Sequence, residues 1–190
     1  RTVDASRTLT GNRLTDPGNR QIIALADATA HILIARGAVD KFNVAWIAGS
    51  SDLSTTLTEA IACVNANGRG TIYIPSGEWT TNGGHALTGG ITVEGDGFST
   101  AGIGTRITLT STTTSIFTIG ENIYDVLFCD LVLDGDSLSA TDGILCTGTF
   151  PNSSRNIRCE GVKFENFTHG FRLRGSGGWQ TASISFDAFC

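Results

Sequence analysis

The chain has 190 residues, of which 24 are glycine and only 3 are proline, and it carries a formal net charge of −5. This length is typical of one medium-sized domain that can bury a sizeable core. The negative charge argues against a nucleic-acid-binding protein, because contact with phosphates requires a basic face. No apolar run approaches the roughly 20 residues that a membrane-spanning helix needs.

Residues 1–48 form a region of their own, in which a polar opening precedes two apolar runs, Gln21–Ala26 and His31–Ala35. We predict short strands around a turn for these runs. The alternation is weak, so a single helix through Asp27–Ala30 remains the alternative.

One helix is predicted, over about Ser54–Asn67, with Gly68 as its stop. Its apolar positions at helical spacing are Leu57, Ala60, Ile61 and Val64. Asp52 or Ser54 can serve as the N-cap. The β-branched run in Gly70–Trp79 then predicts a strand closed by a turn, and only strands and glycine turns are expected after it.

Cysteine usage indicates thiols rather than disulfides. The five cysteines are Cys63, Cys129, Cys146, Cys159 and Cys190. An odd number in a chain of this size favours reduced, buried thiols. No CxxC pair occurs, and His31, His85 and His169 stand apart from acids at ligand spacing, so we expect no metal and no other cofactor.

Internal similarity decides the class of fold. The pattern Val126-x-Phe128-x-x-Leu131 recurs as Ile157-x-Cys159-x-x-Val162, 31 residues on, and as Ile184-x-Phe186-x-x-Phe189 after a further 27. Gly143–Gly148 likewise matches Gly170–Gly175, again 27 residues on. Repeats of this length with two or three short strands each predict an all-β solenoid whose aligned apolar residues stack inward on successive coils.

Three motifs carry a resemblance to a known superfamily. They are Asp52-x-x-x-Thr56-Leu57-x-x-Ala60-Ile61, Gly70-Thr71-Ile72-Tyr73-Ile74-Pro75-x-Gly77-x-Trp79 and Gly90-Ile91-Thr92-Val93-Glu94-Gly95-Asp96-Gly97. With them, residues 52–190 resemble the pectate-lyase-like β-helices of phage tailspikes, tail fibres and polysaccharide-degrading enzymes. The resemblance implies a right-handed parallel β-helix with an N-terminal capping helix, and a homotrimer. The strands predicted above for residues 1–48 add a small β-rich segment before the helix. Phe42–Asp52 departs from the family's Phe-Gly-Ala-x-Gly-Asp-Gly, which leaves the entry into the cap undecided.

The resemblance implies a phage tailspike or tail-fibre protein, of which this chain is the N-terminal part. Residues 1–48 are then an attachment segment for other virion tail proteins, and residues 49–190 hold the capping helix and the start of the β-helix. Such a protein engages a bacterial surface polysaccharide and, in full-length form, can depolymerise it as a glycoside hydrolase or polysaccharide lyase. We expect it on the virion or outside the cell, after synthesis in a reducing cytoplasm. A non-catalytic virion connector or adhesin remains the alternative, because the motifs shape the fold rather than perform chemistry.

Cleavage of a polysaccharide requires two carboxylates, or a base together with neutralisation of a uronate. The inward ladders predict that Asp134 stacks outward with Glu165 and that Glu160 stacks outward with Asp187. These four acids are our candidate catalytic residues, because like charges one coil apart raise the pKa of one partner, as general-acid catalysis requires. The alternative is that they only shape turns, as in Asp134-Gly135-Asp136.

Candidate substrate-binding residues lie near the C-terminal end. Arg172 and Arg174 alternate on one predicted strand and, with Arg158 and Lys163, make the only basic concentration in the solenoid. They can bind the carboxylates of an acidic glycan, or they are simply a solvated strand face. Trp179, in a glycine-rich loop, is a candidate platform for stacking a sugar, whereas the family position of Trp79 predicts a core residue. Each histidine is expected in a polar surface or turn position.

Overall fold

The computed structural model describes residues 8–10, 13–15, 31–37, 43–48, 51–66, 68–97, 104–112, 115–138, 141–149, 154–176 and 184–187. Side chains are described for the same ranges from residue 51 onward, except for residues 63, 149, 176 and 184–187. One helix, α1 (Ser54–Ala66), and fifteen strands are assigned within these ranges. The strands are β1 (Thr8–Thr10), β2 (Arg13–Thr15), β3 (His31–Gly37), β4 (Asn43–Ala48), β5 (Gly70–Tyr73), β6 (Gly77–Thr81), β7 (His85–Leu87), β8 (Ile91–Glu94), β9 (Thr105–Leu109), β10 (Ser115–Ile119), β11 (Tyr124–Asp134), β12 (Asp142–Thr149), β13 (Arg155–Glu165), β14 (His169–Ser176) and β15 (Ile184–Asp187).

The strands from β5 onward stack in parallel. One ladder joins β5, β8, β11, β13 and β15, and beside it β6 pairs with β9, which continues onto the second half of β11. A second sheet of four strands stacks β7, β10, β12 and β14. Each coil thus passes through the same strand positions in the same order, and the protein is a right-handed parallel β-helix, as the repeats and the resemblance predicted.

The predicted stacking positions are correct. Val126 lies opposite Ile157, Phe128 opposite Cys159 and Leu131 opposite Val162. The next coil continues the first two ladders, with Ile184 opposite Ile157 and Phe186 opposite Cys159. The 27-residue repeat is confirmed in the second sheet, where Gly148 lies opposite Gly175.

Long strands β11 and β13 serve two ladders each because they bend at the same level. Asp130 in β11 and Gly161 in β13 occupy equivalent positions and have φ angles of 56° and 61°. This left-handed conformation is costly for most residues and easy for glycine, and it is tolerated by aspartate. The bend turns each strand around a corner of the solenoid without breaking its apolar ladder.

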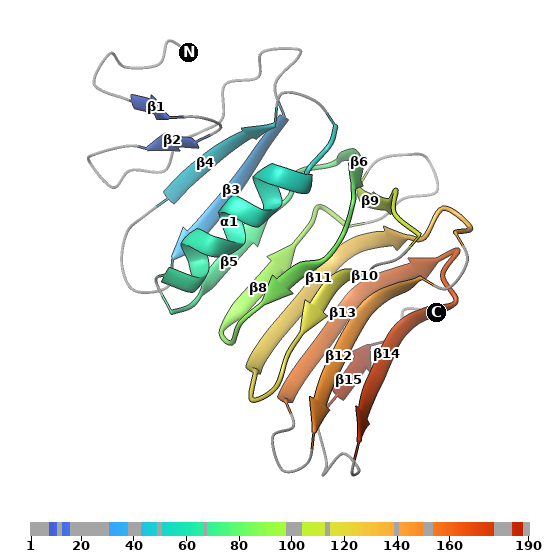
Figure 1. Ribbon diagram of the computed structural model, residues 1–190. Coiled ribbons are helices and arrows are strands. Elements are labelled where there is room, and N and C mark those ends of the chain that lie inside the picture. The colour runs from blue at the N-terminus through green and yellow to red at the C-terminus, as the bar shows by residue number, and fades with distance from the viewer. Residues whose placement is uncertain are drawn as a thin grey trace.

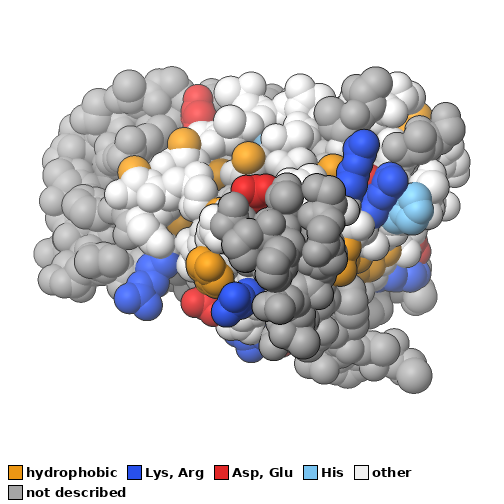
Figure 2. Space-filling model, turned by 60° about the horizontal axis from the view of Figure 1, so that its bottom comes forward, with side chains coloured by type: hydrophobic (Ala, Val, Ile, Leu, Met, Phe, Trp, Pro, Cys, Tyr) orange, Lys and Arg blue, Asp and Glu red, His pale blue; other side chains and the backbone are white. Residues whose placement is uncertain are grey.

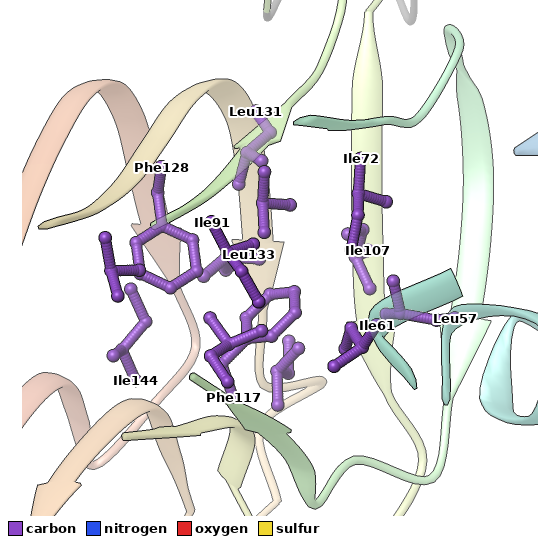
Figure 3. Close-up of a cluster of buried hydrophobic side chains, with 14 of the residues drawn as sticks. Leu57, Ile61, Ile72, Ile91, Ile107, Phe117, Phe128, Leu131, Leu133 and Ile144 are labelled. Atoms are coloured by element: carbon purple, nitrogen blue, oxygen red, sulfur yellow. The ribbon is translucent and has the colours of Figure 1, made fainter. Parts of the chain in front are cut away.

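The interior is filled by apolar side chains from the helix and from every strand position (Figure 3). Phe117 and Phe128 are fully buried, with ring centroids 5.2 Å apart and tilted planes, the arrangement that aromatic pairs prefer. Trp79 is also buried, which confirms its predicted core position. Each such side chain contributes roughly 1.5–3 kcal/mol through removal of apolar surface from water.

Helix α1 lies over the first coils of the stack, and the strands follow it in order toward the C-terminus (Figure 1). It begins as predicted, because Oδ1 of Asp52 accepts hydrogen bonds from the backbone N–H and the hydroxyl of Ser54, at 2.9 and 2.5 Å. Its predicted apolar positions are all buried. Gly68, with a φ angle of 81°, follows its end. The helix therefore closes the open end of the hydrophobic core.

Four short strands precede the helix and extend the larger sheet in antiparallel fashion, in the order β1, β2, β4, β3, with β3 pairing with β5. The predicted strand at His31–Ala35 is confirmed by β3, and β4 resolves the entry into the cap as a strand. The predicted run Gln21–Ala26 and the alternative helix at Asp27–Ala30 lie outside the described residues. In the part of the chain described here, no helix has the length and apolar character needed to cross a membrane.

Candidate functional site

The first pair of predicted catalytic acids, Asp134 and Glu165, lies in register at the ends of β11 and β13. Arg106 on β9 stands between them, with Nη1 at 2.7 Å from Oδ2 of Asp134 and 2.6 Å from Oε2 of Glu165. Its Nε also lies 3.5 Å from Glu78 on β6, and Lys163 lies 2.5 Å from the other oxygen of Glu165. We call these five residues the Arg106 network. It links four strands on successive coils.

The electrostatics of this pair differ from the prediction. Two stacked acids were expected to raise a pKa, but hydrogen bonds from Lys163 and from Arg106 lower the pKa of Glu165 below its ordinary value. The expected rise in pKa is therefore wrong for Glu165. A carboxylate with a lowered pKa is ionised at neutral pH and has no proton to donate as a general acid. Asp134 additionally accepts hydrogen bonds from the backbone N–H of Asp136 and from the amide of Asn166, both at 2.9 Å. These contacts favour the turn-shaping alternative.

The second predicted pair, Glu160 and Asp187, is in register on β13 and β15, and Cys129 on β11 lies opposite Glu160 in the same column. The side chain of Asp187 lies outside the described residues. Glu160 is 39% exposed and accepts a hydrogen bond of 3.2 Å from Arg158. Burial, followed by the charge of Glu94 in the same column, raises the pKa of the Cys129 thiol to about 12. Glu160 is thus paired with a cation on its own strand, as Glu165 is with Lys163.

A different group of side chains meets on the second sheet. Asp142 begins β12, and His169 begins β14 directly opposite it. Oδ1 of Asp142 lies 2.9 Å from Nδ1 of His169, and Oδ2 lies 3.5 Å from Nη1 of Arg172. The Asp142 side chain is only 9% exposed, whereas His169 and Arg172 are 47% and 40% exposed. A nearly buried carboxylate thus holds two exposed side chains, which we call the Asp142 cluster.

Arg174 extends the Asp142 cluster along the same strand. It lies two residues beyond Arg172, on the same face of β14, and it is exposed. Basic side chains lie beside a histidine on the face shown in Figure 2. Arg172, one of the two predicted substrate-binding arginines, therefore shares a carboxylate with a histidine that we expected to have only a polar surface or turn role.

The contacts in the Asp142 cluster indicate which nitrogen of His169 carries the proton and what the neighbouring arginines can do. A carboxylate only accepts hydrogen bonds, so neutral His169 carries its proton on Nδ1 and leaves Nε2 as an acceptor. An imidazole oriented in this way is a general base. Arg172 balances the charge of Asp142, and Arg174 adds a further positive charge to the exposed face. The cluster can bind an anion and take a proton from it.

Two other predictions about this region need correction or stay untested. Arg158 and Lys163 were grouped with Arg172 and Arg174, but they lie on β13 in the other sheet, where they bind Glu160 and Glu165. The basic concentration is therefore divided between two faces. The proposed sugar platform Trp179 lies outside the described residues.

Within the described side chains, no group of three or more His, Cys, Asp or Glu residues is placed to hold a metal ion. Cys129, Cys146 and Cys159 are free thiols, and the last two are buried, as expected. Burial raises the pKa of the Cys146 and Cys159 thiols to about 12. These thiols are packing groups rather than nucleophiles.

Comparison with known proteins supports the fold. No protein-family model matches the sequence. A search of curated proteins also gives no match. Among solved structures, the chain is similar to the A-module of the mannuronan C-5 epimerase AlgE6 of Azotobacter vinelandii, with a TM-score of 0.53 and 23% sequence identity. The alignment covers 65% of this chain and 38% of the epimerase module, so the chain spans well under half of that protein's length. At this identity the similarity establishes a shared β-helix fold.

Proposed function

We propose that this chain binds an acidic polysaccharide at the Asp142 cluster, with Arg172 and Arg174 facing the carboxylates of the sugar chain. The observation that supports this proposal is the pair of exposed side chains, His169 and Arg172, held by the nearly buried Asp142. Asp142 is costly to bury without partners, so it holds both side chains in place, and their exposed parts remain available to a ligand. The structural neighbour, an enzyme that acts on mannuronan, is consistent with a polysaccharide ligand.

The chemistry that the Asp142 cluster best suits is removal of the proton next to a sugar carboxylate. In this step the C–H bond breaks, its proton passes to Nε2 of His169, and the electron pair delocalises into the carboxylate. Arg172, which shares Asp142 with His169, stabilises the additional negative charge. Return of a proton inverts the carbon, whereas loss of the neighbouring glycosidic oxygen cleaves the chain. Both reactions share the first step, so the proposal concerns that step.

Binding and proton removal can be tested separately. We would measure affinity for mannuronan, polygalacturonate and uncharged dextran, and then incubate each acidic polymer with the protein in D₂O and follow its ring protons by NMR. Arg174→Gln should weaken binding of an acidic polymer about tenfold and reduce its salt dependence. His169→Gln should retain binding and lose deuterium exchange. Arg158→Gln, which removes the same charge from the other sheet, is the matched control.

Two results would overturn this proposal. Equal affinity for acidic and uncharged polymers would show that the arginines do not select the ligand. Binding without exchange in the wild-type protein would remove the catalytic part and favour an adhesin or structural connector. The involvement of Asp134 and Glu165 in the Arg106 network supports that second candidate, because it makes acid catalysis by this pair unfavourable.

We further propose, from the sequence resemblance, that the chain belongs to a trimeric phage tailspike or tail fibre whose residues 1–48 attach to other virion tail proteins. The ligand would then be a bacterial surface polysaccharide, met outside the cell. The antiparallel strands β1–β4, which continue the sheet away from the coils, are consistent with an attachment segment. Light scattering of the purified protein tests the trimer, and competition with phage adsorption to host cells tests the biological role. A monomer without any effect on adsorption contradicts both.

A further inference from the structure

A recess of about 690 Å³ lies beside the C-terminal end of α1, and none of its lining residues belongs to the strand β14 that carries Arg174. Its walls come from three separate parts of the chain: Asn65 and Arg69 near the end of the helix, Thr88–Gly90 between β7 and β8, and Tyr124 with Asp125 at the start of β11. The volume is within the usual range of small-molecule sites. It is large enough for one or two sugar rings.

The strand register explains why the recess forms. Pairing of β5, β8 and β11 places Arg69, Gly90 and Asp125 on successive coils, and it places Gly89 next to Tyr124. Glycine has no side chain, so neighbouring coils can approach one another closely at the floor of the recess. A Cβ at Gly90 would lie 2.7 Å from Cβ of Arg69, and one at Gly89 would lie 2.8 Å from the backbone oxygen of Tyr124. Backbone hydrogen bonds of 2.9 Å, from Gly70 to Gly90 and from Gly90 to Tyr124, fix the floor.

The side chains around this recess match the chemistry of a sugar. Tyr124 is 43% exposed, one of only two large hydrophobic side chains exposed to this degree in the described part of the chain. Its ring offers an apolar face with a polar edge, which suits the C–H face of a pyranose and its hydroxyls. Arg69 and Asp125 are exposed and supply donors and acceptors. Asn156 on the next coil donates a hydrogen bond of 2.5 Å to Oδ1 of Asp125, which orients that carboxylate.

We infer that this recess binds a neutral sugar unit, stacked on Tyr124 and hydrogen-bonded by Arg69 and Asp125. The opposite charges of these two residues offset each other, so recognition depends on ring contact and hydroxyl groups rather than on net charge. The inference rests on the proposed function only in its ligand class. It adds a second contact site, formed by residues outside the Asp142 cluster, at which a polysaccharide chain is held independently of that cluster.

The test uses the complete 190-residue chain with hexasaccharides of glucose, mannose, galactose and N-acetylglucosamine at millimolar concentration. Saturation-transfer NMR should detect at least one of them with the wild-type protein. Tyr124→Ala should weaken its binding about tenfold, and Tyr124→Phe, which keeps the ring, should leave binding within about twofold. Because Tyr124 is exposed, both variants should retain the circular dichroism and unfolding midpoint of the wild type.

The outcome separates this site from the Asp142 cluster. Binding here should be unchanged by 0.5 M NaCl and by Arg174→Gln, whereas binding of an acidic polymer should be weakened by both. Absence of binding by every neutral hexasaccharide overturns the inference, and so does equal binding by wild type and Tyr124→Ala. Loss of neutral-sugar binding in Arg174→Gln would assign the signal to the Asp142 cluster and likewise overturn it.

Discussion

Acidification should destabilise the protein through one buried histidine, His85. This side chain lies at the start of β7 and is 3% exposed, so the polar surface or turn position expected for it from the sequence is wrong. Thr58 Oγ1 donates its proton to the backbone oxygen of Ser54, so it accepts from Nδ1 of His85, at 3.1 Å. Thr81 Oγ1 accepts from the backbone N–H of Gly83 and lies 2.6 Å from Nε2, to which it donates. The network therefore holds neutral His85.

Burial lowers the pKa of His85 from 6.5 to about 4, despite the opposing charge of Asp52. The unfolded chain takes up a proton as the pH falls below 6.5, whereas the folded protein does not until about pH 4. The effect of His85 on the free energy of unfolding is therefore absent above about pH 7.5. As the pH falls from 6.5 toward 4, His85 makes the folded protein progressively less stable. Proton linkage gives a loss of roughly 2 kcal/mol between pH 8 and pH 5.

Urea unfolding at pH 8 and pH 5 measures this loss. His85→Gln cannot take up a proton and keeps a donor and an acceptor for the two threonines, so it should be about 2 kcal/mol less sensitive to this pH change than the wild type. The Arg106 network does not interfere, because the pKa of Glu165 lies below its ordinary value of 4.5 and its contribution is lost only at lower pH. Equal pH sensitivity in the two proteins would refute the reasoning.

Three further predictions concern packing. Phe128→Ala should lower the free energy of unfolding by about 3–5 kcal/mol in urea titrations, because the side chain is fully buried. Gly161→Ala should lower the free energy of unfolding more than Gly68→Ala. Both glycines have a positive φ angle, but only at Gly161 would the new Cβ meet another atom, 2.6 Å from Oδ1 of Asp130. We expect about 1–2 kcal/mol for the conformation alone. Cys146 should resist iodoacetamide in the native protein and react after unfolding, as peptide mass spectrometry can show, because it is buried and its thiol pKa is about 12.

The sequence predicted the coil stacking well because a solenoid repeats one geometry. Once Val126 aligned with Ile157, the remaining ladder positions on β11 and β13 followed without further information. The same alignment places Asp142 opposite His169, so that contact was visible in the repeat before the structure was known. It was missed because His169 was assessed against its neighbours in sequence rather than against the preceding coil.

Other features were not predictable from the repeats. Arg106 lies in β9, which has no aligned counterpart among the three repeats, so nothing indicated that its guanidinium would stand between Asp134 and Glu165. Sequence places two acids in one column but cannot show a cation between them, and Lys163 together with Arg106 lowers the pKa of Glu165 where a raised pKa was expected. The recess beside Tyr124 depends on which residues of neighbouring coils lie against Gly89 and Gly90, and the strand register decides this.

The two charged groups of the solenoid should therefore separate stability from binding. In the Arg106 network, the guanidinium contacts Asp134 and Glu165, whose side chains are 13% and 23% exposed. Arg106→Gln removes a charged hydrogen bond from both acids, so it should lower the free energy of unfolding by about 1–3 kcal/mol. Affinity for an acidic polysaccharide should stay unchanged, since this network lies on the other sheet. Arg174→Gln should show the reverse, with an unchanged unfolding midpoint and weakened binding, because Arg174 is exposed. If Arg106→Gln instead weakens binding without destabilising the fold, as urea titration and polymer affinity together would reveal, the ligand lies along the larger sheet and Asp134 and Glu165 regain their place as candidate catalytic residues.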